Sequence, residues 1–239
     1  MTPRSAIDFA IVTALTSLAV LGSERFPVRR IYCVGRDYLD HIREMKETDE
    51  RDPPFFFQKP TDAPMPEGAT VPYPPATNDF QFEVELVAAI GRGGQDLRVE
   101  DAEMHIYGYA IGIDITRRDR QRESAKRGLP WEMGKLFDHS APCGPIHQIA
   151  SYGVIRKGAI TLSDNGQTRQ KGDIANMIWN VPEVIANLST QYELCSGDLI
   201  FTETPAGVGP VVPGDHLECA IDGLGTLRIA IGSKKGGND

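Results

Sequence analysis

The stretch Phe82-Glu83-Val84-Glu85-Leu86-Val87-Ala88-Ala89-Ile90-Gly91 places two carboxylates in an apolar, β-prone run that ends at a glycine. Side chains alternate between the two faces of a strand, so residues two apart share a face and lie about 7 Å apart. Glu83 and Glu85 are therefore expected to stand side by side, with apolar side chains on the opposite face. No further polar residue follows them in the run, which is typical of a buried strand rather than an edge strand.

Two like charges held this close repel each other and raise each other's pKa unless a cation lies between them. The plain alternative is a strand whose glutamate face is simply hydrated. Carboxylates at the mouth of a buried strand need partners, however, because burying an unpaired charge is costly. A second buried strand, predicted over 106–114, ends in Asp114, so three acidic residues lie at the ends of two strands. Carboxylate oxygens favour Mg²⁺ or Mn²⁺, with Ca²⁺ as a further option, over zinc or copper.

The length and composition indicate one globular domain. A chain of 239 residues buries a substantial core, and its net charge of −8 argues against a nucleic-acid or membrane surface. The 24 glycines and 17 prolines are spread along the chain, which favours a mainly β (α+β) architecture over a helical bundle. Cys33, Cys143, Cys195 and Cys219 form no Cys-x-x-Cys pair, so we expect reduced thiols in a cytoplasmic protein.

The N-terminal residues 1–25 are expected to form an arm that packs on a domain made of residues 26–239. Residues 10–22 are apolar and follow Arg4, so the apolar core of a signal peptide is the alternative. This run is too short to span a bilayer. A single preceding arginine and the lack of a clear small-x-small cleavage site argue against export.

Several short elements can be read from local patterns. Strands are expected over 26–35, 55–60, 70–73, 158–162 and 168–171. Asn165-Gly166 favours a tight hairpin turn between the last two of these strands. Residues 181–191 have an amphipathic pattern with a proline in the first turn, which predicts a helix. A further short helix is expected within 99–105.

A solvated helix is predicted over 117–127, because Thr116 and Asp119 resemble a capping box. Arg118 and Gln121 would share one side of this helix. A cluster of arginines on a helix is more often a hydrated surface than a binding site for an organic anion, which is the alternative here. A loop is then expected to lead into a strand at Lys135.

His41 and Glu44 lie three residues apart in a segment whose apolar stripe predicts a helix after Gly35, so they would be neighbours on one helix face. The plain alternative for this pair is an exposed ion pair of little energetic consequence. The charged run 46–54 has no apolar residue before its prolines and is expected to be mobile.

Five ordered motifs together resemble the fumarylacetoacetate hydrolase family. They comprise residues 35–44, the Glu83-x-Glu85 run, residues 108–121, Lys135 and residues 201–210. The resemblance spans roughly 26–231. It implies a mixed β-roll or flattened barrel with a few short helices, usually assembled as a homodimer, in which residues 26–239 form the catalytic domain.

The resemblance also implies a role for each site residue. The implied metal ligands are Glu83, Glu85 and Asp114. The implied catalytic residues are His41 and Glu44, which would activate a water molecule, and the family's conserved lysine, Lys135. The residues that would contact the oxo-acid end of a substrate are Arg118, Gln121 and Thr204.

Within the family, the segments 26–36, 54–60 and 140–145 are similar to those of bacterial members that act in the breakdown of gentisate and salicylate. The implied reaction is metal-dependent hydrolysis of a carbon–carbon bond in an acylpyruvate, a 2,4-dioxo acid. Fumarylpyruvate would give fumarate and pyruvate. Two alternatives stay open: decarboxylation of oxaloacetate or another oxo-acid enolate reaction on the same fold, and a catalytically inactive member that acts as a binding protein.

One residue departs from the family pattern. Glu203 stands in Thr202-Glu203-Thr204-Pro205, where the family turn usually has glycine. If this position requires a positive φ, a glutamate there is strained. If the side chain faces the site, its charge would repel an anionic substrate.

Overall fold

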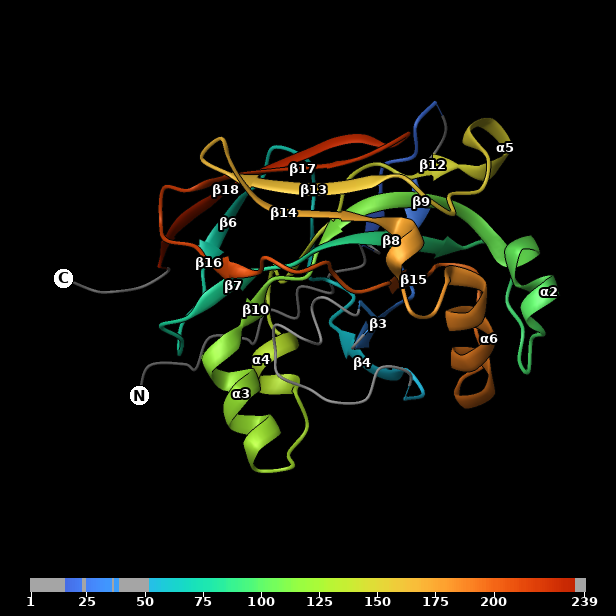
Figure 1. Cartoon of the computed structure of the whole chain (residues 1–239), viewed down its shortest axis with the longest axis horizontal. Coiled ribbons are helices and arrows are strands. Elements are labelled where there is room, and N and C mark those ends of the chain that lie inside the picture. The colour runs from blue at the N-terminus through green and yellow to red at the C-terminus, as the bar shows by residue number, and fades with distance from the viewer. Residues whose placement is uncertain (1–15, 23–24, 36, 39–51, 235–239) are drawn as a thin grey trace, which may run out of the picture.

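The computed structural model describes residues 16–22, 25–35, 37–38 and 52–234. Strands predominate in these residues and the helices are few and short, which confirms the predicted mainly β class. Figure 1 shows two larger sheets, one above the other, with α3 and α4 on one side of the molecule and α2 and α6 on the other. Both sheets are open in the described residues and do not close into a barrel.

The first large sheet has six strands in the order β12-β9-β8-β15-β3-β4. Their bounds are β12 His147–Gln148, β9 Ile106–Ile113, β8 Val84–Ile90, β15 Asp198–Phe201, β3 Arg30–Gly35 and β4 Phe55–Lys59. β8 pairs antiparallel with both β9 and β15, whereas β15 and β3 are parallel. The glutamate-bearing run thus lies inside the sheet, as the sequence predicts.

The second large sheet has five strands in the order β14-β13-β17-β18-β6. Their bounds are β14 Gln167–Asp173, β13 Ala159–Asp164, β17 His216–Ile221, β18 Gly225–Lys234 and β6 Thr70–Tyr73. The predicted Asn165-Gly166 turn joins β13 to β14, and both turn residues have positive φ, 50° and 79°. These are the backbone angles that this dipeptide accepts at low cost in a two-residue hairpin.

Three smaller sheets complete the strands of the described residues. They contain β10 Thr116–Arg117, β7 Phe80–Phe82 and β16 Gly209–Pro210; β11 Ala141–Pro142 and β5 Pro64–Met65; and β1 Ser17–Leu18 and β2 Phe26–Pro27. The pairing of β1 with β2 attaches part of the N-terminal arm to the start of the domain.

The helical elements are α2 Val99–Ala102, η1 Glu103–His105, α3 Arg118–Lys126, α4 Glu132–Lys135, α5 Ile149–Tyr152, η2 Ile174–Asn176 and α6 Val181–Gln191. The predicted helix at 181–191 is confirmed, and a capping box between Asn180 and Glu183 closes its N-terminus. None of the helices in the described residues is long and apolar enough to span a bilayer.

Two local predictions are wrong. α3 has no side-chain cap at its N-terminus; Asp119 instead accepts hydrogen bonds from Thr77 Oγ1 at 2.6 Å and Asn78 N at 3.0 Å. Lys135 ends the short helix α4 rather than preceding a strand. In both cases partners distant in sequence override the local pattern.

Both faces of β8 are buried in apolar clusters. Leu86, Ala88 and Ile90 belong to a cluster that lies between the two large sheets and includes Leu162 and Leu227 of the five-stranded sheet. The alternate residues, Val87 and Ala89, belong to a second cluster with strands β3 and β15 and the arm residues around 18–20. Full burial of one large aliphatic side chain contributes about 1.5–3 kcal/mol. The two clusters therefore pack against both faces of the strand that carries Glu85.

Candidate functional site

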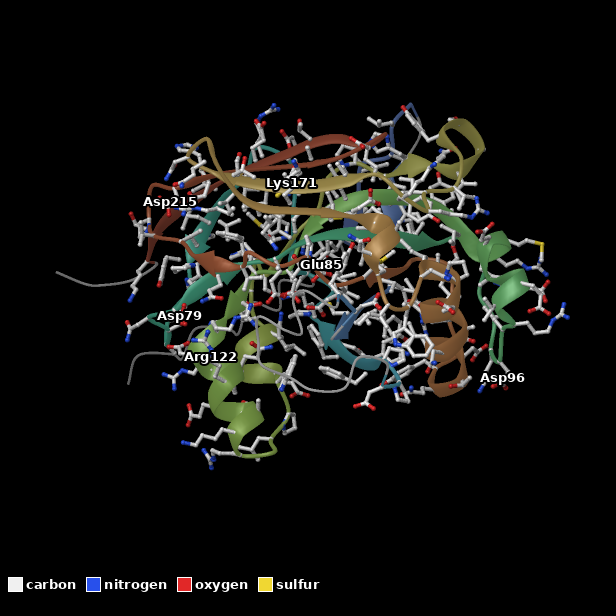
Figure 2. All side chains as sticks on the ribbon, viewed as in Figure 1. Asp79, Glu85, Asp96, Arg122, Lys171 and Asp215 are labelled. Atoms are coloured by element: carbon white, nitrogen blue, oxygen red, sulfur yellow. The ribbon has the colours of Figure 1, made fainter. Side chains whose placement is uncertain are left out.

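Three carboxylates meet where β8 begins and β9 ends. Glu83 connects β7 to β8, Glu85 lies in β8, and Asp114 directly follows β9. Val84 pairs with Ile113 across the antiparallel ladder, and Asp114 N donates to Glu83 O at 2.8 Å, so the two chain segments are aligned side by side. One oxygen of each carboxylate lies within 4.8 Å of the others. Figure 2 shows Glu85 near the centre of the molecule.

The environment of Glu85 fits a metal ion. Burial raises the pKa of Glu85 well above its ordinary range, and the charges of Asp114, Glu203 and Glu83 raise it further. Its Oε2 accepts a hydrogen bond from Glu203 N at 3.0 Å, whereas its Oε1 is buried and has no hydrogen-bond partner among the described residues. Oxygen atoms of this kind are the ligands that hard divalent cations prefer. The three carboxylates could therefore hold such an ion.

Lys135 lies against the same carboxylates. Its Nζ donates to Glu83 Oε2 at 2.6 Å, to Asp114 Oδ2 at 2.8 Å and to Thr116 Oγ1 at 2.8 Å. Burial lowers its pKa, but the charges of Asp114 and Glu83 outweigh that effect and keep the pKa above its ordinary value. The two carboxylates therefore favour the charged form of Lys135.

The preceding residue, Gly134, allows this placement. A Cβ atom on Gly134 would lie 2.7 Å from the backbone nitrogen of Gln121 in α3, closer than real Cβ contacts. Glycine thus lets α4 approach α3 closely enough to bring Lys135 to the carboxylates.

The first turn of α3 brings a buried arginine to the site. Arg118 is 1% exposed. Its Nε donates to Gln81 Oε1 at 2.9 Å, and its two terminal nitrogens donate to Gln121 Oε1 and Glu83 Oε1. The sequence predicted that this helix is largely solvated, but the side that carries Arg118 and Gln121 is buried. Both residues lie beside the triad. Their contact with a substrate stays a prediction.

The 202–205 turn closes another side of the site. Thr204 Oγ1 donates to Val84 O at 2.8 Å and accepts from Gln170 Nε2 at 2.7 Å, so its hydroxyl group is engaged within the protein. Glu203 has φ 78° and therefore adopts the left-handed conformation that the glycine of the family turn would accept easily. Burial raises the pKa of Glu203 to about 8, with the charge of Glu83 adding to the effect and Lys135 opposing it.

A second buried lysine was missed in the sequence. Lys59 Nζ lies 2.8 Å from Asp114 Oδ1 and donates to Lys135 O at 2.9 Å and Ile115 O at 3.2 Å. One signal was available in the sequence: Lys59 ends an apolar strand. A lysine buried there requires acceptors for its ammonium group. Its partners lie 56 and 76 residues away in sequence, so local patterns could not identify them.

His41, Glu44 and most of the charged run 46–54 lie outside the described residues. The chain shortly before this pair is anchored. Asp37 O accepts from Ile178 N at 2.7 Å, and Asp37 Oδ1 accepts from Trp179 N at 2.6 Å. The pairing of His41 with Glu44 stays a prediction.

Comparison with known proteins places these residues in a family context. A family model described as "Fumarylacetoacetate (FAA) hydrolase C-terminal" matches residues 30–231. A fumarylpyruvate hydrolase of a Ralstonia species is 43% identical over 178 residues, which cover 74% of this chain and 92% of that protein. The mitochondrial oxaloacetate tautomerase FAHD1 of Mus musculus is 38% identical over 206 residues, 85% of this chain and 91% of that protein.

Among solved structures, a fumarylpyruvate hydrolase from Pseudomonas aeruginosa in complex with Mn²⁺ and pyruvate is similar in both fold and sequence. It is 48% identical with a TM-score of 0.90, and the match covers 92% of this chain and 97% of that one. The fold described above is therefore that of the family along nearly the whole chain.

Proposed function

Because the chain belongs to the fumarylacetoacetate hydrolase family, we propose that it is a metal-dependent hydrolase that cleaves a carbon–carbon bond of an acylpyruvate. The proposed substrate is fumarylpyruvate, which would give fumarate and pyruvate in aromatic catabolism. The observation that carries this proposal is the buried Glu83, Glu85 and Asp114 triad, with a carboxylate oxygen that lacks a partner among the described residues. The 43% identity to the Ralstonia fumarylpyruvate hydrolase supports the choice of substrate.

The three carboxylates would hold a divalent ion, with Mn²⁺ or Mg²⁺ as the proposed occupant. The Pseudomonas aeruginosa structure in complex with Mn²⁺ and pyruvate supports this proposal. When bound, such an ion supplies Lewis acidity to the oxo-acid end of the substrate.

The side chains of this protein would perform the other steps. We assign to His41, held by Glu44, the removal of a proton from the water molecule that attacks the C4 carbonyl carbon. Lys135 would stabilise the negative charge that develops on the C4 oxygen. This role requires its ammonium group to exchange one of its three present acceptors for that oxygen. The C3–C4 bond then breaks, fumarate takes up the water oxygen, and pyruvate leaves as an enolate that is protonated at C3.

Arg118, Gln121 and Thr204 are the proposed substrate contacts. A guanidinium group can bind a carboxylate through two parallel hydrogen bonds, which suits Arg118 for the anionic end of the substrate. The role requires Arg118 to exchange at least one present partner, Glu83 or Gln121, for the substrate. The protein is further proposed to act as a homodimer in the cytoplasm, without a nucleic-acid or membrane partner.

A second candidate function is tautomerisation of oxaloacetate, favoured by the 38% identity to the Mus musculus oxaloacetate tautomerase. Oxaloacetate is also a 2-oxo acid whose C3 proton is acidic. Its tautomerisation moves a proton between C3 and the C2 oxygen and breaks no carbon–carbon bond. The two activities therefore differ in whether the reaction consumes water.

The experiment uses chelator-stripped protein with and without Mn²⁺ or Mg²⁺. The expected result is metal-dependent loss of the ultraviolet enol absorbance of fumarylpyruvate, with fumarate and pyruvate formed in equal amounts. The matched control is Glu85→Gln, which keeps the shape of the side chain and should lose both metal binding and turnover. A metal-dependent change in oxaloacetate enol absorbance, without cleavage of fumarylpyruvate, would instead favour the tautomerase.

A further inference from the structure

The ammonium group of Lys59 is fully engaged within the protein. It forms an ion pair with Asp114 Oδ1 at 2.8 Å and donates hydrogen bonds to Lys135 O at 2.9 Å and Ile115 O at 3.2 Å. Two of the three N–H donors of the ammonium group thus have backbone carbonyl acceptors, and its charge faces a carboxylate. The side chain is completely buried. The ammonium group of Lys59 is thus enclosed by protein groups.

The carboxylate of Asp114 lies between two lysines. Lys59 contacts Oδ1 and Lys135 contacts Oδ2, each at 2.8 Å. Lys135 also contacts Glu83, so it lies on the side of Asp114 that faces the other acidic residues. Lys59 lies at the end of β4 and contacts the other oxygen.

Lys59 also fixes the backbone from which Lys135 projects. Its bond to Lys135 O holds the C-terminal end of α4, and its bond to Ile115 O holds the chain directly after Asp114. A single ammonium group therefore links β4, the segment after β9 and α4.

We propose that Lys59 is a positioning residue that orients Asp114 for metal binding and places Lys135 for catalysis; this inference rests on the proposed metal-dependent function. Packing alone does not account for a lysine here, because a buried ion pair often stabilises a fold no better than apolar residues of similar volume. Removing a residue that contacts a metal ligand and orients it typically weakens metal binding or activity 10–100-fold.

The direction of the change in Mn²⁺ affinity on replacing Lys59 distinguishes a positioning role from a purely electrostatic one. Removing an ammonium group next to a metal site relieves repulsion of the cation, so charge alone predicts tighter metal binding. Loss of orientation predicts weaker binding. Lys135→Met provides the comparison, because it removes the same charge at the same 2.8 Å distance from the other oxygen of Asp114, together with a contact to Glu83.

The test is calorimetric titration of Mn²⁺ into substrate-free, chelator-stripped protein. Lys59→Met should bind Mn²⁺ at least tenfold more weakly than the unsubstituted protein, whereas Lys135→Met should bind it equally or more tightly. Lys171→Met, at an exposed position of β14, should match the unsubstituted protein. In turnover assays saturated with Mn²⁺, Lys59→Met should lower kcat at least tenfold with little change in KM.

Equal or tighter Mn²⁺ binding by a folded Lys59→Met variant would overturn the inference and leave the proposed function intact. Absence of Mn²⁺ binding by the unsubstituted protein would instead contradict the proposed function itself. Lys59→Gln, which keeps a donor on a shorter side chain, serves as a second variant and should also bind Mn²⁺ more weakly. If neither variant folds, Lys59 has a purely structural role and the proposal fails.

Discussion

The carboxyl groups of the site outnumber the basic side chains that contact them in the described part of the chain. The buried acidic residues are Glu83, Glu85, Asp114 and Glu203, and the buried basic residues are Lys59, Lys135 and Arg118. The raised pKa values of Glu85 and Glu203 reflect this excess of negative charge together with burial. A bound divalent cation would reverse the excess, which links the protonation of the site to its metal content.

The stability of the metal-free protein should depend on pH through Glu203. Its ordinary pKa is 4.5, and the folded protein raises it to about 8. Between these values the folded state holds a proton that the unfolded chain has released, so this stabilising contribution is complete below about pH 4.5 and is lost as the pH rises to about 8. Thermal unfolding of chelator-stripped protein should show a falling Tm over that interval.

Glu203→Gln is the control for this pH dependence, because the amide does not titrate. The fall in Tm should be shallower in this variant. An equally steep fall in Glu203→Gln, or a Tm that rises with pH in the unsubstituted protein, would contradict the assignment. Since Mn²⁺ competes with protons for the site, its affinity should increase over the same interval.

The backbone of Glu203 carries a separate cost. A non-glycine residue at φ 78° is strained by about 1 kcal/mol or more. Glu203→Gly should therefore increase the free energy of unfolding of the metal-free protein, measured by urea denaturation. Glu203→Ala removes the carboxyl group and keeps the strain, so it should be less stable than Glu203→Gly. If the alanine variant is the more stable, strain is not the cause.

At the scale of elements, Gln170 joins the two large sheets at the site. It lies in β14, where its Oε1 accepts from Val84 N at 3.0 Å. Its Nε2 donates to Thr204 Oγ1 and to Pro205 O, each at 2.7 Å. One amide group thus holds the start of β8 and the 202–205 turn.

Replacing Gln170 by leucine should destabilise the protein by about 1–3 kcal/mol, because Val84 N would be left buried without a partner. The measurement is the free energy of unfolding in urea. Gln167→Leu is the control, since Gln167 is exposed on the same strand and should change stability by less than about 0.5 kcal/mol. Equal effects of the two substitutions would show that the bridge contributes nothing.

Elements with a strong local signal could be predicted from the sequence. The alternation around Glu83 and Glu85, the Asn165-Gly166 turn and the helix at 181–191 are all encoded by adjacent residues. The lack of a side-chain cap on α3 could not be predicted, because Asp119 bonds instead to Thr77 and Asn78, about 40 residues away in sequence. α4 was missed because a single turn before an apolar pair resembles a loop that enters a strand.

For the candidate site, the residue pattern predicted the acidic triad and the family resemblance added Lys135, and the structure places these side chains together. The sequence did not identify Lys59 or Gln170, because neither residue type signals a site without its distant partners. The His41 and Glu44 pair lies outside the described residues, so its place in the site stays a prediction.

At the scale of the whole molecule, the two sheets hold the β8 and β9 ends together, and short segments from other parts of the chain supply the basic residues. β4 contributes Lys59, α3 contributes Arg118 and α4 contributes Lys135. The acidic triad thus lies at the ends of inner strands of the six-stranded sheet, whereas the cations come from its edge strand β4 and from the helices α3 and α4 (Figure 1).

The central claim, metal-dependent hydrolysis of an acylpyruvate, is tested most directly by the fate of the water oxygen. Chelator-stripped protein is mixed with fumarylpyruvate in ¹⁸O-labelled water, with and without Mn²⁺, and the fumarate is analysed by mass spectrometry. We expect fumarate that carries one ¹⁸O atom in its new carboxylate, formed only with Mn²⁺. Failure to form fumarate, or formation of fumarate without ¹⁸O, would contradict hydrolysis. Formation of fumarate at an equal rate without Mn²⁺ would contradict the metal dependence.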